Sequence, residues 1–294
     1  MSGNEASQAR PELGLVRAQV DGRAVWAVRR GDDYSPLGMS LSELLRLPAH
    51  EARSAVDAAR GGGLTPERLL APIDPQQEVW AAGVTYLRSR DGRIEEASDG
   101  TPYDRVYVAE RPELFFKSTG ARAIGPGAPI GIRADSAWNV PEPELGIVLD
   151  ADGGLFGYVP GDDASSRSIE GENLLYLPQA KIYTASCGLG PEIVPAWTVK
   201  GPFEIGLEIR RDGGLEFAGA ASTGQMARRL DDLADWLYQG LDFPDGVIML
   251  TGTGVVPEAD FTLLPGDEVV VDISGIGRLS NPVVEVGRHE GARQ

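Results

Sequence analysis

Alternating apolar and polar residues mark the N-terminal part of the chain, and a helical spacing follows. Residues 13–30 (LGLVRAQVDGRAVWAVRR) alternate on both sides of an Asp-Gly pair, which predicts a β-hairpin. Residues 42–60 (SELLRLPAHEARSAVDAAR) place apolar side chains at helical spacing, with an interruption at Pro48, and three glycines then end the pattern. These elements predict a small α+β domain over residues 1–74, with residues 65–74 as a linker.

Strand patterns dominate the rest of the chain, residues 75–294. One amphipathic helix is predicted over residues 225–240, with Thr223 as its N-cap. Strands are predicted within residues 77–86, 111–118, 144–161, 201–219, 247–254 and 267–287. Many strands, few helices and frequent glycine turns predict an α+β, sheet-dominated roll for this larger domain.

The composition is that of a globular protein with an acidic surface. Of the 294 residues, 42% are hydrophobic, which is enough apolar material for a sizeable core. The formal net charge of −17 disfavours nucleic acid and anionic membranes as partners. An anionic substrate would therefore need a local cation or a bound metal ion in its site.

The numbers of cysteines and histidines, and the lack of long apolar runs, limit the cellular compartment and the kinds of catalytic site to be expected. Cys187 is the only cysteine, so no internal disulfide can form, which favours a cytoplasmic protein. The N-terminus lacks the apolar segment of a signal peptide, and no run approaches the roughly 18 apolar residues of a membrane span. With only two histidines, His50 and His289, neither a Ser-His-Asp triad nor a multi-histidine metal site is expected.

Two pairs of acidic residues border the apolar run LGIVL. Glu142 and Glu144 lie two apart in NVPEPELG, and Asp162 and Asp163 are adjacent in GYVPGDDASSR. On a strand, residues two apart face the same side about 6–7 Å from each other, and their charges repel unless a cation lies between them. A hard divalent cation such as Mg²⁺ prefers oxygen ligands, and a carboxylate from the aspartate pair would complete the set.

The alternative is that these acids are solvated side chains of an acidic protein. The prolines before both glutamates remove two backbone N–H donors, which indicates a sheet edge or a strand entrance. Lys181 is the only lysine between Lys117 and Lys200, and it lies among apolar and small residues. Near the acids it would be an electrostatic or acid/base group, or equally a structural ion pair.

Five ordered motifs between about residues 78 and 287 resemble the fumarylacetoacetate hydrolase superfamily. EPELGIVL resembles the family's E-x-E-L strand, and GYVPGDDASSR resembles its GYT-x-x-NDVSAR segment. AKIYTASCGLGPEIVP resembles its lysine segment, LTGTGV its TGTP-x-G loop, and LLPGDEVVVDISGIGRLSNPV its C-terminal strands. The resemblance implies a mixed β-sandwich roll of the fumarylacetoacetase C-terminal type, preceded by a small N-terminal α+β domain, in a homo-oligomer (dimer or tetramer).

The resemblance also implies a metal site. Glu142, Glu144 and Asp163 match the family's divalent metal ligands, while Asp162 stands where asparagine is usual. The expected ion is Mg²⁺, with Mn²⁺ or Ca²⁺ as alternatives, and no organic cofactor is expected.

A departure from the family pattern bears on the reaction. Lys181 matches the active-site lysine, and Thr251 and Thr253 match the loop that holds substrate. Hydrolytic and decarboxylating members commonly carry a water-activating histidine and glutamate after G-x-N-Y, but here the asparagine position is Thr85 and the histidine position is Ser89. GVTYLRSRD instead resembles the dehydratase branch that acts on 2-keto-3-deoxy pentonates such as L-2-keto-3-deoxyarabonate.

That branch implies a small sugar acid as the substrate and loss of water as the reaction. The substrate's carboxylate and 2-oxo oxygen would chelate the metal ion, which stabilises the enolate formed when a C3 proton leaves. The C4 hydroxyl then departs, and tautomerisation gives 2-oxoglutarate semialdehyde. Lys181 would stabilise the enolate or move the C3 proton, and Glu113 would be the acid/base for the hydroxyl.

Three further residues are candidate substrate contacts. Arg88 and Ser89 would bind the carboxylate or the distal hydroxyls, because a guanidinium fork suits a carboxylate, and Lys117 would also contact the substrate. The alternatives are a surface ion pair for Arg88, an exposed strand-end acid for Glu113, and ordinary strand residues for the two threonines.

Three rival functions stay open. A C–C bond hydrolase of acylpyruvates, or an oxaloacetate decarboxylase, would share the scaffold but needs the histidine–glutamate pair. A pyruvate-releasing aldolase would use the same enolate, so the sequence separates it poorly from a dehydratase. A non-catalytic binding protein would be expected to carry a damaged site, whereas the acids and Lys181 are all present.

Overall fold

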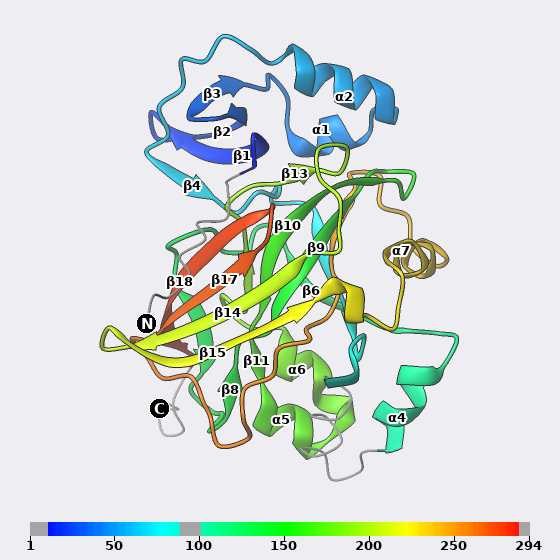
Figure 1. Ribbon diagram of the computed structural model, residues 1–294, viewed down its shortest axis with the longest axis vertical. Helices are drawn as coiled ribbons and strands as arrows, with labels where there is room; N and C mark the ends of the chain where they lie inside the picture. The colour runs from blue at the N-terminus through cyan, green and yellow to red at the C-terminus, as the bar shows by residue number, and fades with distance from the viewer. Residues whose placement is uncertain (1–10, 89–100, 288–294) are drawn as a thin grey trace, which may run out of the picture.

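The computed structural model describes residues 11–88 and 101–287 (Figure 1). A four-stranded antiparallel sheet forms the N-terminal part, in the order β3-β2-β1-β4. Its strands are β1 (Leu13–Val20), β2 (Arg23–Arg30), β3 (Asp33–Pro36) and β4 (Arg68–Leu70). The predicted hairpin turns at Asp21 and Gly22, whose φ angles of 49° and 72° suit a two-residue turn between twisted strands.

Two short helices pack in the same apolar cluster as this sheet. They are α1 (Leu41–Leu45), which begins with a capping box of Ser40 and Glu43, and α2 (Ala49–Ala58). Pro48 separates them as predicted, because proline supplies no N–H to continue the first helix.

A seven-stranded mixed sheet carries the site. Its path is β12-β10-β9-β16-β5-β6, with β13 pairing beside β12 on β10. The strands are β5 (Glu78–Gly83), β6 (Glu113–Thr119), β9 (Pro143–Leu149), β10 (Leu155–Asp163), β12 (Cys187–Leu189), β13 (Val194–Pro195) and β16 (Val247–Leu250). β16 runs parallel to β5 and antiparallel to β9, so segments far apart in sequence meet at the middle of the sheet.

A five-stranded sheet, in the order β15-β14-β17-β18-β7, faces the seven-stranded sheet and completes the roll. Its strands are β7 (Ile130–Arg133), β14 (Glu204–Arg211), β15 (Gly214–Ser222), β17 (Glu268–Ile273) and β18 (Gly277–Val286), and a two-stranded ladder joins β8 (Asn139–Val140) to β11 (Ser165–Ser166). The remaining helices are α4 (Thr101–Val108), α5 (Arg167–Glu172), α6 (Leu177–Lys181) and α7 (Leu230–Tyr238), with 3₁₀ turns η1 (Leu174–Tyr176) and η2 (Thr223–Gln225). The fold is therefore α+β and mostly strand, as predicted.

Both faces of the seven-stranded sheet are buried, which explains its continuous apolar runs. On β9, Ile147 and Leu149 point into the cluster shared with β14, β17 and α7. Val148 points to the opposite face, where Val159 and Leu250 join it in a second cluster that includes residues of the N-terminal sheet and helices. The N-terminal elements therefore complete the burial of one face of this sheet.

Two predictions about local structure were wrong. The helix predicted over residues 225–240 begins only at Leu230, and Thr223 is not its N-cap, because the Thr223 hydroxyl accepts a hydrogen bond from the Phe203 N–H (2.8 Å). The residues between these two points run beside Thr85 and Tyr86, which follow β5. The Ala227 N–H donates to the Thr85 carbonyl, and Met226 forms a β-bridge with Tyr86. The predicted linker over residues 65–74 contains β4, which pairs with β1. The domain boundary near residue 74 stays a prediction.

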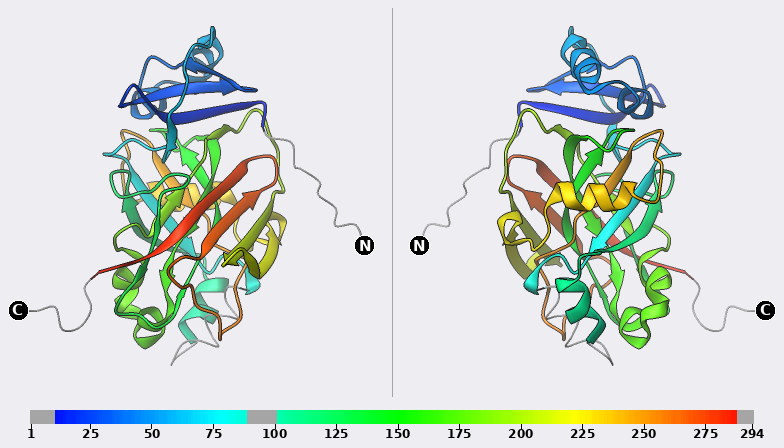
Figure 2. Two further views of the ribbon diagram at one scale, coloured as in Figure 1. Left: turned by 90° about the vertical axis from the view of Figure 1, so that its left-hand side faces the viewer. Right: turned by 90° about the vertical axis from the view of Figure 1, so that its right-hand side faces the viewer.

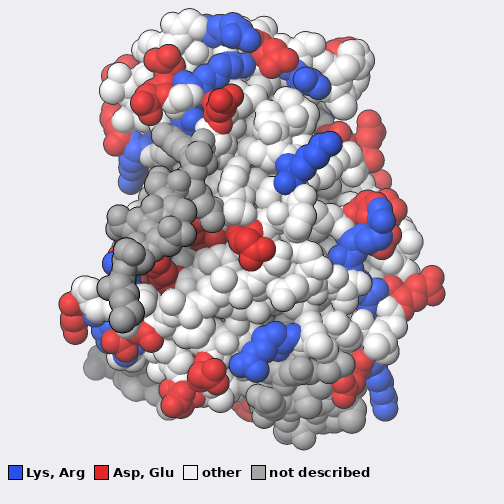
Figure 3. Space-filling view, in the orientation of Figure 1, with Lys and Arg blue, Asp and Glu red and all other residues white. Residues whose placement is uncertain are grey.

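The outer face of the five-stranded sheet is largely uncharged in the middle (Figure 3). A shallow hollow is lined there by small residues such as Gly206, Ala218 and Ala220, together with the charged residues Glu208, Asp272 and Arg278. Within the described ranges, no helix has the length and apolar character needed to span a bilayer. The homo-oligomer and the cytoplasmic location stay predictions.

A buried ion pair joins the N-terminal sheet to the end of the roll on which that sheet sits (Figure 2). Arg29 on β2 donates to both carboxylate oxygens of Glu192, at 2.5 and 2.8 Å, and the two side chains are 0% and 1% exposed. The guanidinium also donates to the carbonyls of Pro11 and Gly31, so it is fully engaged. Beside this pair, Leu15 and Ile193 exchange backbone hydrogen bonds.

We expect the substitution Arg29→Met to lower the free energy of unfolding by about 3–5 kcal/mol, because it removes the guanidinium that donates two hydrogen bonds to the buried Glu192 carboxylate. Urea unfolding of the purified protein measures this. Arg23→Met, at an exposed position of the same strand, is the matched control and should change little. The double variant Arg29→Met/Glu192→Leu should recover part of the loss; equal losses in the single and double variants would contradict the explanation.

Candidate metal centre and active site

Three carboxylates converge where β9 begins and β10 ends. Glu142 directly precedes β9 and Glu144 lies on it, and the Asp163 N–H donates to the Glu142 carbonyl across the ladder (3.0 Å). One carboxylate oxygen from each of these residues lies within 4.8 Å of the others, and all three side chains are buried. Glu142 thus marks a strand entrance, as predicted, but β9 lies inside the sheet and not at an edge.

Asp162 points to the other face of β10, away from this carboxylate triad (Glu142, Glu144 and Asp163). Its Oδ1 accepts from the Glu142 N–H at 3.0 Å, whereas its buried Oδ2 has no hydrogen-bond partner in the part of the chain that the structure describes. A Cβ placed on Gly188 would meet Asp162 together with Ile130 and Leu279, which shows the apolar character of its surroundings. Burial raises the pKa of Asp162 to about 7.

Lys181 bridges two members of the triad from the end of α6. Its ammonium donates to Glu142 Oε2 (2.7 Å), Asp163 Oδ2 (2.9 Å) and Ser165 Oγ (2.7 Å). Three N–H donors with three acceptors indicate a protonated lysine. The structure therefore places Lys181 beside the acids, as the sequence suggested.

Lys117 lies behind Asp163 and does not line the pocket. The fully buried ammonium pairs with Asp163 Oδ1 and donates to the carbonyls of Lys181 (2.6 Å) and Ala164 (3.0 Å). Burial opposes ionisation of Asp163, but Lys117 and Lys181 together outweigh it and lower its pKa. The predicted contact of Lys117 with substrate is therefore replaced by a contact with a metal-ligand candidate and with the backbone of Lys181.

Glu144 has the least electrostatic compensation in the triad. Burial raises its pKa well above the ordinary value, and the nearby charges of Asp163 and Glu142 raise it further. Among the described residues no lysine or arginine lies within ion-pair distance of it, and the Gly252 N–H is its hydrogen-bond donor (2.6 Å). An all-oxygen donor set with an uncompensated member suits a hard divalent cation, so the triad fits the expected magnesium.

The Thr251–Thr253 loop is shaped by Gly252. Its φ is +92°, and a Cβ there would lie 2.0 Å from Thr85 Oγ1, so only glycine fits. The Thr85 hydroxyl donates to the Thr251 carbonyl (2.7 Å), and the buried Thr251 hydroxyl donates to the Leu145 carbonyl (2.8 Å). Thr253 lines the pocket, whereas Thr251 anchors the loop.

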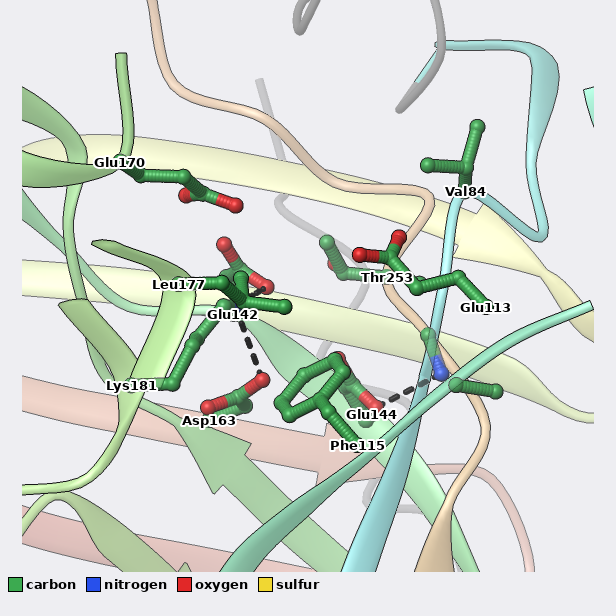
Figure 4. A pocket seen from close by; sticks show the side chains of 13 residues that line it. Val84, Glu113, Phe115, Glu142, Glu144, Asp163, Glu170, Leu177, Lys181 and Thr253 are labelled. Atoms are coloured by element: carbon green, nitrogen blue, oxygen red, sulfur yellow. Dashed lines mark hydrogen bonds and ion pairs between the residues drawn. The ribbon is translucent and has the colours of Figure 1, made fainter. Parts of the chain in front are cut away.

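A small cavity opens above the triad, with free space of about 10 Å³, and Figure 4 shows the side chains around it. Glu113, at the start of β6, and Glu170, on α5, both border this cavity (the pocket). The same two glutamates also border a second cavity of about 320 Å³, lined mostly by apolar side chains of α4 and of the α5–α6 segment.

Several pocket residues were missed from the sequence. Glu170 is one, and its signal was the spacing from Arg167, since residues three apart share a helix face. The Arg167 guanidinium lies 3.2 Å from Glu142 Oε1, which ties α5 to the triad. Val84 is another pocket residue, and its φ of +54° is unusual for a β-branched side chain and typical of functional sites.

One predicted substrate contact does not line the described part of the pocket, and another falls outside the described residues. Arg88 is exposed at the end of the first described range, and Ser89 lies outside the described residues. Glu113 does line it, which favours a functional position over an exposed strand-end acid.

We expect Glu144→Gln to weaken Mg²⁺ binding at least tenfold, measured by isothermal titration calorimetry, because it removes a ligand charge. The same substitution should raise the unfolding temperature in EDTA, because it removes a buried carboxylate whose ionisation is opposed. Glu258→Gln, at an exposed site, makes the same charge change and is the control. Unchanged Mg²⁺ affinity in Glu144→Gln would exclude Glu144 as a ligand.

Asp162→Asn should stabilise the protein in EDTA by an amount that depends on pH. Because burial raises the carboxyl pKa from 3.8 to about 7, the folded protein loses stability as the pH rises through this window. The advantage of the variant should therefore grow by on the order of 2 kcal/mol between pH 5 and pH 7 and stay level above pH 7. Chemical unfolding at several pH values, with the exposed-site variant Asp260→Asn as control, tests this; a pH-independent difference would contradict it.

Comparison with known proteins agrees with this geometry. The family model described as "Fumarylacetoacetate (FAA) hydrolase C-terminal" matches residues 79–284. The "Probable 2-keto-3-deoxyxylonate dehydratase" of Haloferax volcanii is 49% identical over 217 residues, which cover 73% of this chain and 74% of that protein. The 2-dehydro-3-deoxy-D-arabinonate dehydratase of Saccharolobus solfataricus is 44% identical over 222 residues, covering 74% of each.

A solved structure extends the likeness over nearly the whole chain. It is 2-keto-3-deoxy-D-arabinonate dehydratase complexed with magnesium and 2,5-dioxopentanoate, with a TM-score of 0.79 and 33% identity. The match covers 94% of this chain and 99% of that one, so it includes the N-terminal elements. By its motifs, its fold and these matches, the chain belongs to the fumarylacetoacetate hydrolase C-terminal family.

Proposed function

We propose that this protein is a magnesium-dependent dehydratase that converts a 2-keto-3-deoxy pentonate to 2,5-dioxopentanoate, which is 2-oxoglutarate semialdehyde. The observation that carries the proposal is a buried carboxylate triad beside Lys181, in a pocket bordered by Glu113. The names of the two relatives at 44–49% identity support the substrate class.

The D isomer at C4 is our preferred substrate, in place of the L isomer expected from the sequence. Oxidation at C2 and loss of the C3 hydroxyl leave C4 as the only stereocentre, so xylonate and arabinonate of one series yield the same compound. The Saccharolobus relative and the magnesium-bound structure are both named for the D series. The enzyme would therefore distinguish substrates by the configuration at C4 and not by the sugar from which they derive.

The chain's own residues have distinct tasks in this proposal. Glu142, Glu144 and Asp163 hold the magnesium ion, which when bound withdraws electrons from the 2-oxo group. Lys181, with its three donors engaged by acceptors, offers positive charge to an oxyanion and not a base. Glu113 is then the acid/base that takes the C3 proton and protonates the departing C4 hydroxyl.

Dehydration is preferred to the rival reactions on the basis of the pocket's residues. Its described lining contains carboxylates and Lys181 but no histidine. His50 is exposed on α2, and His289 lies outside the described residues. An imidazole base that activates water for hydrolysis is therefore missing from this lining, while an aldolase differs in its product, pyruvate.

The direct test is an NMR time course with Mg²⁺ and with EDTA, in which D- and L-2-keto-3-deoxyarabonate are supplied separately. We expect 2,5-dioxopentanoate from the D isomer only when metal is present. Lys181→Met should lower kcat at least 100-fold, because it removes the charge that stabilises the oxyanion. Lys200→Met, at an exposed site, is the control.

Other products would redirect the assignment. Pyruvate would identify an aldolase, and turnover of the L isomer alone would restore the sequence-based expectation. Consumption of oxaloacetate or an acylpyruvate with neither pentonate changed would contradict the dehydratase.

A further inference from the structure

The proposed product requires hydrogen to leave C5 of the substrate, which loss of water alone does not accomplish. Removal of a C3 proton and the C4 hydroxyl leaves 5-hydroxy-2-oxopent-3-enoate, a conjugated enone that still carries its C5 alcohol. The aldehyde forms only after a C5 proton is removed and carbons C3 and C4 are protonated. Two different carbons therefore lose protons, and each needs a base within reach.

Two carboxylates outside the triad are in position to serve as bases. Glu113 comes from the sheet and Glu170 from α5, and Figure 4 shows them entering the pocket from opposite sides. Lys181 is unsuited to this task because its donors are engaged with Glu142, Asp163 and Ser165. The pocket thus holds one candidate base on each side of the space above the triad.

Glu170 is held at the pocket by the helix that also contacts the metal site. It is 5% exposed and lies three residues after Arg167, whose guanidinium reaches Glu142. Residues three apart share a helix face, so the ion pair of Arg167 orients Glu170 toward the same site. A carboxylate on a helix that is fixed in this way keeps its position relative to bound substrate.

The two elements that carry the glutamates give them different positions in the pocket. The triad marks the end where the 2-oxo acid group would bind, so C5 extends toward the second cavity. Glu113 and Glu170 both border that cavity, and Glu170 does so together with Leu174 and Leu177 of its own α5–α6 segment. Glu113 is packed onto the sheet, where a Cβ on Gly83 would lie 2.0 Å from its carboxylate. Glu113 therefore lies over the sheet, and Glu170 lies opposite it, on the α5–α6 side of both cavities.

We infer that Glu170 is the catalytic base of the isomerising half of the reaction, an inference that rests on the proposed dehydratase function. In the first half, Glu113 takes the C3 proton and passes it to the C4 hydroxyl as the C4–O bond breaks, which releases water. In the second half, Glu170 takes a C5 proton and returns it to C3. The resulting enol loses its hydroxyl proton and gains one at C4, so no oxidant or reductant is consumed.

The test compares Glu170→Gln with Glu113→Gln and with Glu172→Gln, an exposed position of the same helix. With Mg²⁺ and the D substrate, Glu170→Gln should still consume substrate but accumulate the enone, seen as rising ultraviolet absorbance and as vinyl protons by NMR. Its rate of aldehyde formation should fall at least 100-fold, and added wild-type enzyme should convert the accumulated enone to aldehyde. Glu113→Gln should stop substrate consumption, and Glu172→Gln should behave as wild type.

Three outcomes would overturn the inference. Aldehyde formation by Glu170→Gln at the wild-type rate would show that another group removes the C5 proton. Loss of substrate consumption without enone would place Glu170 in the first half or in a structural role, because a distorted pocket slows both halves. Enone accumulation in Glu113→Gln instead would reverse the two assignments. Failure of the wild-type enzyme on every 2-keto-3-deoxy pentonate would sink the proposed function itself, which is a separate result.

Discussion

Burial of three carboxylates on one face of a sheet is the constraint on which this site depends. Each charge taken from water must be offset nearby, and two of the three are: Lys117 and Lys181 pair with Asp163, while Lys181 and Arg167 reach Glu142. Glu144 receives a backbone N–H and no ion pair among the described residues. The protein alone therefore leaves one negative charge uncompensated at the point where a divalent cation would sit. The same buried carboxylate of Glu144 therefore favours metal binding and destabilises the folded protein when no metal is bound.

The sheet creates this constraint because both of its faces are covered. The triad lies on the face that carries Val148, Val159 and Leu250, and the N-terminal sheet and helices pack on that apolar part. One face thus has an apolar half, closed by the N-terminal elements, and a polar half that holds the acids. The buried ion pair of Arg29 and Glu192 holds the N-terminal sheet against the roll. By excluding water from this face, the N-terminal part contributes to the low dielectric constant that strengthens electrostatic interactions at the site.

Local patterns in the sequence predicted most strands and the shared face of Glu142 and Glu144, whereas the choice of Asp163 as the third ligand came from the family resemblance. Local patterns failed where long-range contacts decide. The hairpins and the acids lie within short segments whose alternation settles which side chains share a face. The residues before α7 pair with Thr85 and Tyr86, more than a hundred residues earlier, and no local signal shows this contact. Lys117 was predicted to contact substrate, and its contact with Asp163, which is distant in sequence, appears only in the fold. Glu170 was passed over because a lone glutamate on a short helix resembles a solvated residue until Arg167 is seen to tie that helix to the triad.

The departure from the family pattern at Thr85 affects both the reaction chemistry and the position of the loop that holds Glu144. Compared with the family pattern, Thr85 replaces the usual asparagine, four residues before Ser89 replaces the usual histidine. In the fold, the Thr85 hydroxyl holds the Thr251 carbonyl and packs against Gly252, whose N–H binds Glu144. The same segment that lacks a water-activating base therefore stabilises a metal-ligand candidate through one loop. The described lining of the pocket holds carboxylates and no imidazole, and under the proposed function this composition favours proton transfer between carbon and oxygen of the substrate over attack by an outside water.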